Sequence, residues 1–168
     1  MYKRQLFDDE KSIALSQAAY PQYAETNPYD MAGCSIDTAY KNLIVSGANS
    51  KKIAILDNFC WCSSDEPERL YQLKEAAKAC YDYAVAYQTP FISGKDSMFN
   101  DFKGFDKTGK SVKISIPPTL LISSIGVVDK ISHLTKMTPD DGDILLVLGN
   151  TRNELQDSVY SKIIGYEK

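Results

Sequence analysis

KIAILDNFCWCSSDEPERLYQLKEAAKACYDYAVAYQTPFISGKDS, residues 52–97, carries the pattern that decides the fold class. The apolar runs at 52–56 and 90–93 have the length of buried strands. Between them, the Asp-Glu-Pro sequence at 65–67 marks the start of a helix, because acidic residues favour a first turn and proline is tolerated there. The apolar spacing that follows predicts a helix to about Ala86. This stretch therefore predicts strand, helix and strand in succession.

The flanking sequence continues the interleaving of helices and strands. The other expected elements are a short helix over 9–19, a helix over 31–45, a hairpin-like excursion over 98–113, a strand over 120–128, a turn over 140–143, a strand over 144–148 and a helix over 153–164. Pro117 and Pro118 keep the long strand from starting earlier, since proline cannot donate to a sheet ladder. This order predicts an α/β or α+β fold.

Composition limits the classes of protein to which the chain can belong. Of its 168 residues, 43% are hydrophobic and 24% charged, which predicts a packed core. The net charge of -3 gives no basic footprint, so we expect no nucleic-acid partner. No apolar run approaches the roughly 20 residues that span a bilayer, and the N-terminus has no signal-like apolar segment. We therefore expect no membrane association, a cytoplasmic location and four reduced cysteines.

The chain divides into three parts at the level of sequence. Its first five residues, MYKRQ at 1–5, resemble the translated end of a transposon sequencing adapter, so we expect them to be non-native and natural sequence to start near Leu6. The adapter's codons in the underlying DNA would test this. A polar, turn-rich stretch then separates an expected main domain at 6–135 from an expected truncated domain at 143–168.

Polar residues with possible chemistry follow the two central apolar runs. Asp57 ends the first, and Gly94, Lys95, Asp96 and Ser97 follow the second. Ligands bind beyond the carboxyl ends of strands in α/β folds, glycine allows close approach of a phosphate, and carboxylates can hold Mg²⁺. The alternative is that Asp57 caps a turn and that the second group forms a polar turn.

Other residue patterns that could form sites give weaker signals. The second motif is not a Walker A loop, because Thr89 stands where that pattern requires glycine. Cys60 and Cys62 have the wrong spacing for a zinc knuckle and lack a second pair, so we expect small buried cysteines. The single histidine, His133, has no evident partner and is expected at the surface. Asn42 could help to hold a metal or phosphate, or it is simply a polar group near the end of a helix.

Longer motifs resemble a known family. They are NPYDMAGCSIDTAYKNLIVSGA, KKIAILDNFCW, DEPERLYQLKEAAKACYDYA, TPFISGKDSMFN and SIPPTLLISSIGVV, in that order. Together they resemble the second half of phosphoribosylformylglycinamidine synthase over nearly the whole chain, from about Ala18 to Ser158. The resemblance implies an aminoimidazole-ribonucleotide-synthetase-like N-terminal domain, with a mixed sheet flanked by helices that helps to form a shared barrel. It also implies that the start of the C-terminal α+β domain follows.

The resemblance implies roles for the polar residues of the two central motifs. Asp57 and Gly94 match positions that contact ATP. Lys95 stands where the family often has a metal-binding asparagine, so a lysine there would contact phosphate and Asp96 would hold the metal. Ser97 matches a serine that contacts substrate.

A further metal position is implied on the helix at 31–45. Asn42 matches a metal-binding asparagine of the large form of the family. The glutamate found four residues earlier is Thr38 here, and the adjacent Asp37 could compensate.

The resemblance also implies a reaction, cofactors and partners. The family converts formylglycinamide ribonucleotide to its amidine with ATP, Mg²⁺ and ammonia from glutamine. The family's catalytic histidine and the glutaminase residues fall outside this sequence, so no catalytic residue is assigned and we expect no activity from the chain alone. The expected partners are the first half of the synthetase and a glutaminase domain or subunit.

Other readings remain open from the sequence. The chain could be another ATP-binding member of the same superfamily, such as aminoimidazole ribonucleotide synthetase, selenophosphate synthetase or thiamine-phosphate kinase. It could also be a non-catalytic subunit or a plain interaction domain, which would bind no nucleotide.

Overall fold

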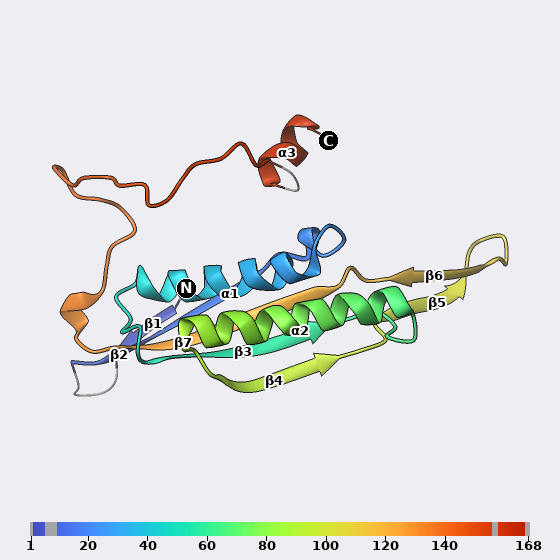
Figure 1. Cartoon of the computed structure of the whole chain (residues 1–168), viewed down its shortest axis with the longest axis horizontal. Helices are drawn as coiled ribbons and strands as arrows, with labels where there is room; N and C mark the ends of the chain where they lie inside the picture. Colours follow the sequence, from blue (N-terminus) through green and yellow to red (C-terminus); the bar gives the residue numbers. More distant parts are fainter. Residues whose placement is uncertain (1, 6–9, 156–157, 167–168) are drawn as a thin grey trace. The chain divides into compact units, whose positions relative to one another are not determined.

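The computed structural model describes residues 2–5, 10–155 and 158–166. The chain forms two compact units, Met1–Thr135 and Lys136–Lys168. The first unit contains β1 (Tyr2–Gln5), β2 (Ser12–Ala19), a 3-10 turn (Pro21–Tyr23), α1 (Pro28–Ile44), β3 (Ile53–Cys60), α2 (Pro67–Tyr87), β4 (Phe91–Ser97), β5 (Asp101–Phe105), β6 (Ser111–Ser115), β7 (Thr119–Val128) and a second 3-10 turn (Ile131–His133), and the second contains α3 (Val159–Ile164) (Figure 1).

Five strands of the first unit form one mixed sheet in the order β1-β2-β7-β3-β4. The first four are antiparallel to their neighbours, whereas β3 and β4 are parallel. A parallel pair needs a long crossover, and α2 supplies it. The expected mixed sheet flanked by helices is therefore confirmed.

Both long helices cover the same face of this sheet (Figure 1). Burial alternates along β7 at every second residue, as expected when one face of a strand meets a core and the other does not. The core between sheet and helices includes Met31, Ile36, Ile55, Trp61, Leu120 and Ile122, all fully buried. Neither α1 nor α2 covers the opposite face, which carries half-exposed apolar side chains, with Leu15 42% exposed.

The helix expected over 9–19 is wrong where the structure describes it, and Asp9 lies outside the described residues. Residues 12–19 form β2, which pairs with β7 along its whole length. Ser12, Ala14 and Ser16 alternate toward the helices and are buried. The tertiary partner decides the conformation, because the helix propensity of an Ala- and Ser-containing segment is a weak preference. Tyr2–Gln5 pairs with the start of β2, and the origin of this pentapeptide stays a prediction.

The two central strands exist as expected but are longer than the sequence indicated. β3 continues through Asp57 to Cys60, and β4 continues through the Ser-Gly-Lys-Asp-Ser motif to Ser97. Both motifs were expected in loops after the strands, and this placement is wrong. The ladder between β3 and β4 extends as far as Cys60 opposite Ser97, which keeps both segments extended.

The two long helices were predicted nearly to their ends. Asn27 caps α1 by accepting a hydrogen bond from the Asp30 amide at 3.1 Å. The apolar spacing of α2 predicts an inward face that includes Leu70, Ala76 and Cys80. Ala76 and Cys80 are buried, whereas Leu70 is 53% exposed, and the buried set also includes Gln72 and Ala79. The reason is that α2 packs against α1 as well as against the sheet.

The second unit, residues 136–168, contains little regular structure. The expected turn at 140–143 is confirmed by a hydrogen bond from the Asp143 amide to the Asp140 carbonyl at 3.1 Å. The strand expected over 144–148 does not form, and its side chains are 79 to 93% exposed. A strand needs a neighbour for its backbone groups, and no ladder reaches this segment among the described residues.

The last helix is shorter than expected. α3 begins only at Val159, because the Ser158 hydroxyl caps it there by accepting from the Ser161 amide at 3.0 Å. Residues 156 and 157, part of the expected helix, lie outside the described residues. None of the helices in the described ranges is long and apolar enough to cross a membrane.

Candidate functional site

Asp57 and Gly94 lie directly opposite each other on the parallel strands β3 and β4. The Asp57 carboxylate lies over the backbone of Gly94. A Cβ atom at position 94 would be 2.5 Å from Oδ1 and 2.7 Å from Oδ2 of Asp57. Both distances are far inside van der Waals contact, so this arrangement requires glycine. The Asp57 carboxylate and the Gly94 backbone thus bring the two motifs into contact, although 36 positions separate them in the sequence.

Asp96 lies on the same face of β4 as Gly94, since side chains two residues apart share a face. Asp57 and Asp96 line a cavity of about 290 Å³ beneath α2, whose other walls are Phe59, Leu73, Ala77, Cys80, Phe91 and Met98. Burial raises the pKa of Asp57, and the nearby Asp96 carboxyl raises it further by charge repulsion and a hydrogen bond. Within the described part of the chain, no ion pair joins a lysine or arginine to either carboxylate. Two carboxylates without a cation are a donor set that suits Mg²⁺.

Lys95 and Ser97 point to the opposite face of the sheet. Their positions alternate with Gly94 and Asp96, and the Lys95 ammonium donates to the Ser97 hydroxyl. The motif is therefore divided between two faces because it is a strand and not a loop. β4 is the last strand of the sheet, so a ligand lying across its outer edge could still reach side chains on both faces.

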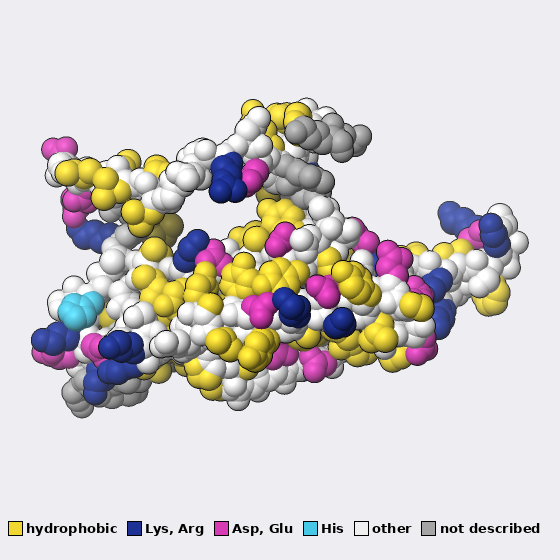
Figure 2. All heavy atoms as spheres, viewed as in Figure 1, with side chains coloured by type: hydrophobic (Ala, Val, Ile, Leu, Met, Phe, Trp, Pro, Cys, Tyr) yellow, Lys and Arg dark blue, Asp and Glu magenta, His cyan; other side chains and the backbone are white. Residues whose placement is uncertain are grey.

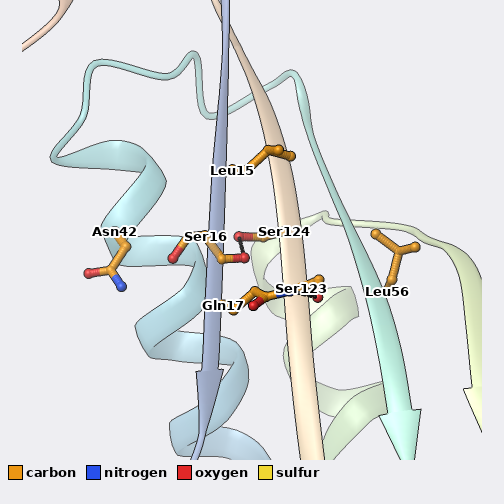
Figure 3. A pocket seen from close by; sticks show the side chains of 7 residues that line it. All are labelled: Leu15, Ser16, Gln17, Asn42, Leu56, Ser123 and Ser124. Atoms are coloured by element: carbon orange, nitrogen blue, oxygen red, sulfur yellow. Dashed lines mark hydrogen bonds between the residues drawn. The ribbon is translucent and has the colours of Figure 1, made fainter. Parts of the chain in front are cut away.

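Asn42 lies apart from the two aspartates. It extends from α1 beside β2, and β7 separates β2 from the strand that carries Asp57. Asn42 lines a hollow of about 510 Å³ with Leu15, Ser16, Gln17, Leu56, Ser123 and Ser124 (Figure 3). Its side-chain amide has no hydrogen-bond partner among the described residues. The structure thus does not bring Asn42 together with Asp96.

Asp37 and Thr38, which precede Asn42 on α1, contact other side chains. Asp37 forms an ion pair with Lys41 at 2.7 Å and accepts a hydrogen bond from the Tyr87 hydroxyl at 2.5 Å. The Thr38 hydroxyl lies 3.0 Å from the Tyr20 hydroxyl. Asp37 is therefore already occupied on the α2 side of the helix.

Of the two cysteines expected to be buried, Cys62 is buried and Cys60 is only half-buried. All four are free thiols, with Cys62 and Cys80 buried. Burial raises the pKa of Cys80 to about 12, so its thiol is protonated at neutral pH. No group of three or more metal-ligating side chains occurs in the described ranges, and His133 is exposed.

One structurally important polar residue was missed in the sequence. The Asp101 side chain is only 2% exposed, and its carboxylate accepts a hydrogen bond from the Ser63 amide at 3.1 Å. It also lies 3.6 Å from the Lys113 ammonium. A hydrogen bond from the Ser115 hydroxyl is the main cause that holds the pKa of Asp101 below its usual range, and the Lys113 charge and the Ser63 amide add to it. Spacing gives no signal for this role, since Asp101 joins segments that are distant in the chain.

The fold and the motifs together define the class of protein. Residues 4–128 match the family "AIR synthase related protein, N-terminal domain", and the chain belongs to this family. Among curated proteins it is similar to phosphoribosylformylglycinamidine synthase subunit PurL. The PurL of Cereibacter sphaeroides is 28% identical over 158 residues, covering 94% of this chain and 20% of the relative. The PurL of Thermococcus sibiricus is 31% identical over 162 residues, covering 96% and 21%.

Solved structures show the same fold. Thermotoga maritima PurL complexed with ATP superposes with a TM-score of 0.64 at 20% identity, covering 82% of this chain and 21% of that one. Thiamine monophosphate kinase from Aquifex aeolicus gives a TM-score of 0.51 at 11% identity, covering 75% and 39%. The chain spans about a fifth of the length of the PurL relatives.

Proposed function

We propose that this chain supplies part of the ATP, Mg²⁺ and substrate surface of a phosphoribosylformylglycinamidine synthase of purine biosynthesis. The observation that carries the proposal is the Asp57 carboxylate lying over Gly94 and beside Asp96, in a chain similar to PurL. Structures of Thermotoga maritima PurL with ATP and with FGAR support both ligand classes.

The proposed reaction has two stages. ATP phosphorylates the amide oxygen of formylglycinamide ribonucleotide, and ammonia derived from glutamine then displaces phosphate to give the amidine. Positioning and electrostatic stabilisation carry such a phosphoryl transfer. Mg²⁺ would neutralise charge on the phosphoryl oxygens.

Each site residue has a proposed role. Asp57 and Asp96 would hold Mg²⁺, and Gly94 leaves room for the Asp57 carboxylate. Lys95 would bind a phosphate across the edge of β4, and Ser97 would contact substrate on the same face. Asn42 would act as a metal ligand only at a separate position, since it lines a different hollow.

The proposed partners follow from the open sheet face and the relatives. The sheet face that α1 and α2 leave uncovered carries half-exposed apolar side chains, Leu15 and Leu121 among them, which suits a second sheet from the other half of the synthetase. We place this chain in the second half of the enzyme. A glutaminase partner is supported by the Thermotoga maritima PurLQS assembly. The site would act in the cytoplasm and only in the assembled enzyme.

Calorimetry with Mg·ATP tests the nucleotide surface. The wild-type chain should bind, Asp57→Ala should not, and the control Glu75→Ala should bind like wild type, because Glu75 lies on α2 outside the cavity. Equal binding by Asp57→Ala, or no binding by wild type even in a complex with a PurL-type first half, contradicts the proposal. Amidine formation by the isolated chain would contradict the proposed dependence on partners.

A further inference from the structure

The two faces of the sheet differ in the sign of their charge. Charged side chains are few on the described strands β2, β7, β3 and β4: they are Asp57, Lys95 and Asp96. Asp57 and Asp96 lie on the face that α2 covers. Lys95 lies on the open face, the one that α1 and α2 leave uncovered. Over the helices, in contrast, Figure 2 shows acidic and basic side chains interspersed. The open face of these strands therefore carries a single positive charge.

Asn58 lies beside this charge. It is directly opposite Lys95 in the parallel ladder of β3 and β4, so both side chains point to the open face. Neighbouring strands are about 4.8 Å apart, which puts both polar groups within contact of one ligand. The Asn58 carboxamide oxygen accepts from the Cys60 thiol at 3.6 Å, and its nitrogen donates to no group in the described part of the chain. Asn58 is half-buried, so these two N–H donors are available to a ligand.

Ser97 extends the polar row along β4. The Lys95 ammonium donates to the Ser97 hydroxyl, and it forms no ion pair with a carboxylate of the described residues. Ser97 shares the open face with Lys95, because side chains two residues apart on a strand point the same way. We call Asn58, Lys95 and Ser97 the open-face row. The row combines one cation with neutral hydrogen-bond donors and contains no carboxylate.

The charge of the open-face row discriminates between phosphate ligands. Mg·ATP brings a metal ion that prefers carboxylate oxygens, and the carboxylates lie on the other face. A phosphate monoester needs no metal ion, and it carries a charge of about −1.5 to −2 at neutral pH. Charge-assisted hydrogen bonds from a lysine and from neutral donors satisfy such a group. The row therefore suits a phosphate monoester better than a metal-bound polyphosphate.

We propose that Asn58 binds the phosphate monoester of the ribonucleotide substrate, together with Lys95 and Ser97. This inference rests on the proposed function, because it takes formylglycinamide ribonucleotide as the substrate. It adds Asn58 to the site and divides the two phosphate-bearing ligands between the two faces of the sheet. Substrate and Mg·ATP then meet across the outer edge of β4, the last strand of the sheet.

Calorimetry on the full chain, alone and in complex with a PurL-type first half, tests this role. The probes are the ribonucleotide, its dephosphorylated riboside and Mg·ATP. Asn58→Leu removes the donors at similar size, and it should weaken ribonucleotide binding by about 10- to 100-fold, the range for a hydrogen bond to a charged group. Asn58→Asp adds a negative charge and should weaken it further. Both variants should bind the riboside and Mg·ATP like wild type.

Gln17 offers matched controls on the same face. It lies on β2 and donates to the Ser123 hydroxyl at 3.0 Å (Figure 3). Two strand spacings, about 10 Å, separate β2 from β3, and salt screens charges over a similar distance. Gln17→Leu and Gln17→Glu should therefore bind the ribonucleotide like wild type. Unchanged fluorescence of the buried Trp61 shows that each variant is folded.

The possible failures are distinguishable. Unchanged ribonucleotide binding by Asn58→Leu, or loss of Mg·ATP binding in the Asn58 variants, overturns the inference. Inorganic phosphate that binds as tightly as the ribonucleotide overturns the assignment to a monoester. A wild type that binds Mg·ATP but not the ribonucleotide overturns this inference and leaves the nucleotide surface standing. A wild type that binds neither ligand, even in the complex, contradicts the proposed function as well.

Discussion

Gly94→Ala places a methyl group against the Asp57 carboxylate. The shortest distance, 2.5 Å, is about 0.9 Å less than an ordinary contact. Overpacking of this kind costs about 1–3 kcal/mol. Removing glycine from a strand interior returns about 0.5–1 kcal/mol through a less flexible unfolded chain. The expected net loss of stability therefore lies between about 0 and 2.5 kcal/mol, with a central value of about 1 kcal/mol.

Urea unfolding followed by fluorescence of Trp61, the single tryptophan, measures this difference. The sharper test repeats the substitution in an Asp57→Ala background, where the clash is gone. Gly94→Ala should then stabilise the protein by about 0.5–1 kcal/mol, so that its effect changes sign. The same destabilisation in both backgrounds would refute the assignment of the clash to the Asp57 carboxylate.

Two further predictions concern the same unit. Asp57→Asn should stabilise the protein at neutral pH, because the raised pKa of Asp57 in the folded state makes its ionisation unfavourable to folding. This advantage should shrink as the pH falls through the raised pKa toward the ordinary aspartate value of 3.8, and a pH-independent effect in urea titrations would contradict it. Trp61→Phe should cost about 1–3 kcal/mol, because the fully buried indole donates to the Arg69 carbonyl at 3.0 Å. Circular dichroism must follow its unfolding since the fluorophore is removed, and a cost below about 0.5 kcal/mol would show that Arg69 finds another donor.

The elements with strong periodic signals were predicted well from the sequence. α1, α2 and β7 combine long apolar patterns with a proline or acidic start, and these signals are local. β2 was misassigned because SIALSQAA suits a helix by propensity, while its actual partner lies far along the chain. The strand predicted over 144–148 was wrong for the opposite reason. Its local pattern favours a strand, but no strand of the described chain pairs with it.

The candidate site was predicted by residue type, but its geometry was not. The structure brings Asp57, Gly94 and Asp96 together, in strands and not in loops, and their role as a binding site stays a prediction. Glycine and charged residues made 94–97 look like a turn, and pairing with β3 overrides that local preference. Side chains alternate between the two faces of a strand, so Lys95 and Ser97 lie on the face opposite Gly94 and Asp96. The spacing of the motif alone could not predict this division, because it depends on the segment being a strand.

The position of β7 at the centre of the sheet has a consequence for synthesis on the ribosome. β7 pairs with both β2 and β3, and the contact between Ser124 and Ser16 joins residues 108 apart in sequence. At about 5–20 residues per second, β2 waits about 5–20 s for its partner after it has been made. During that interval the sheet lacks its central strand, so β2 and β3 have no partner in common. Nascent chains that stall before Thr119 should therefore be bound by chaperones or degraded, whereas chains that have passed Val128 should resist protease.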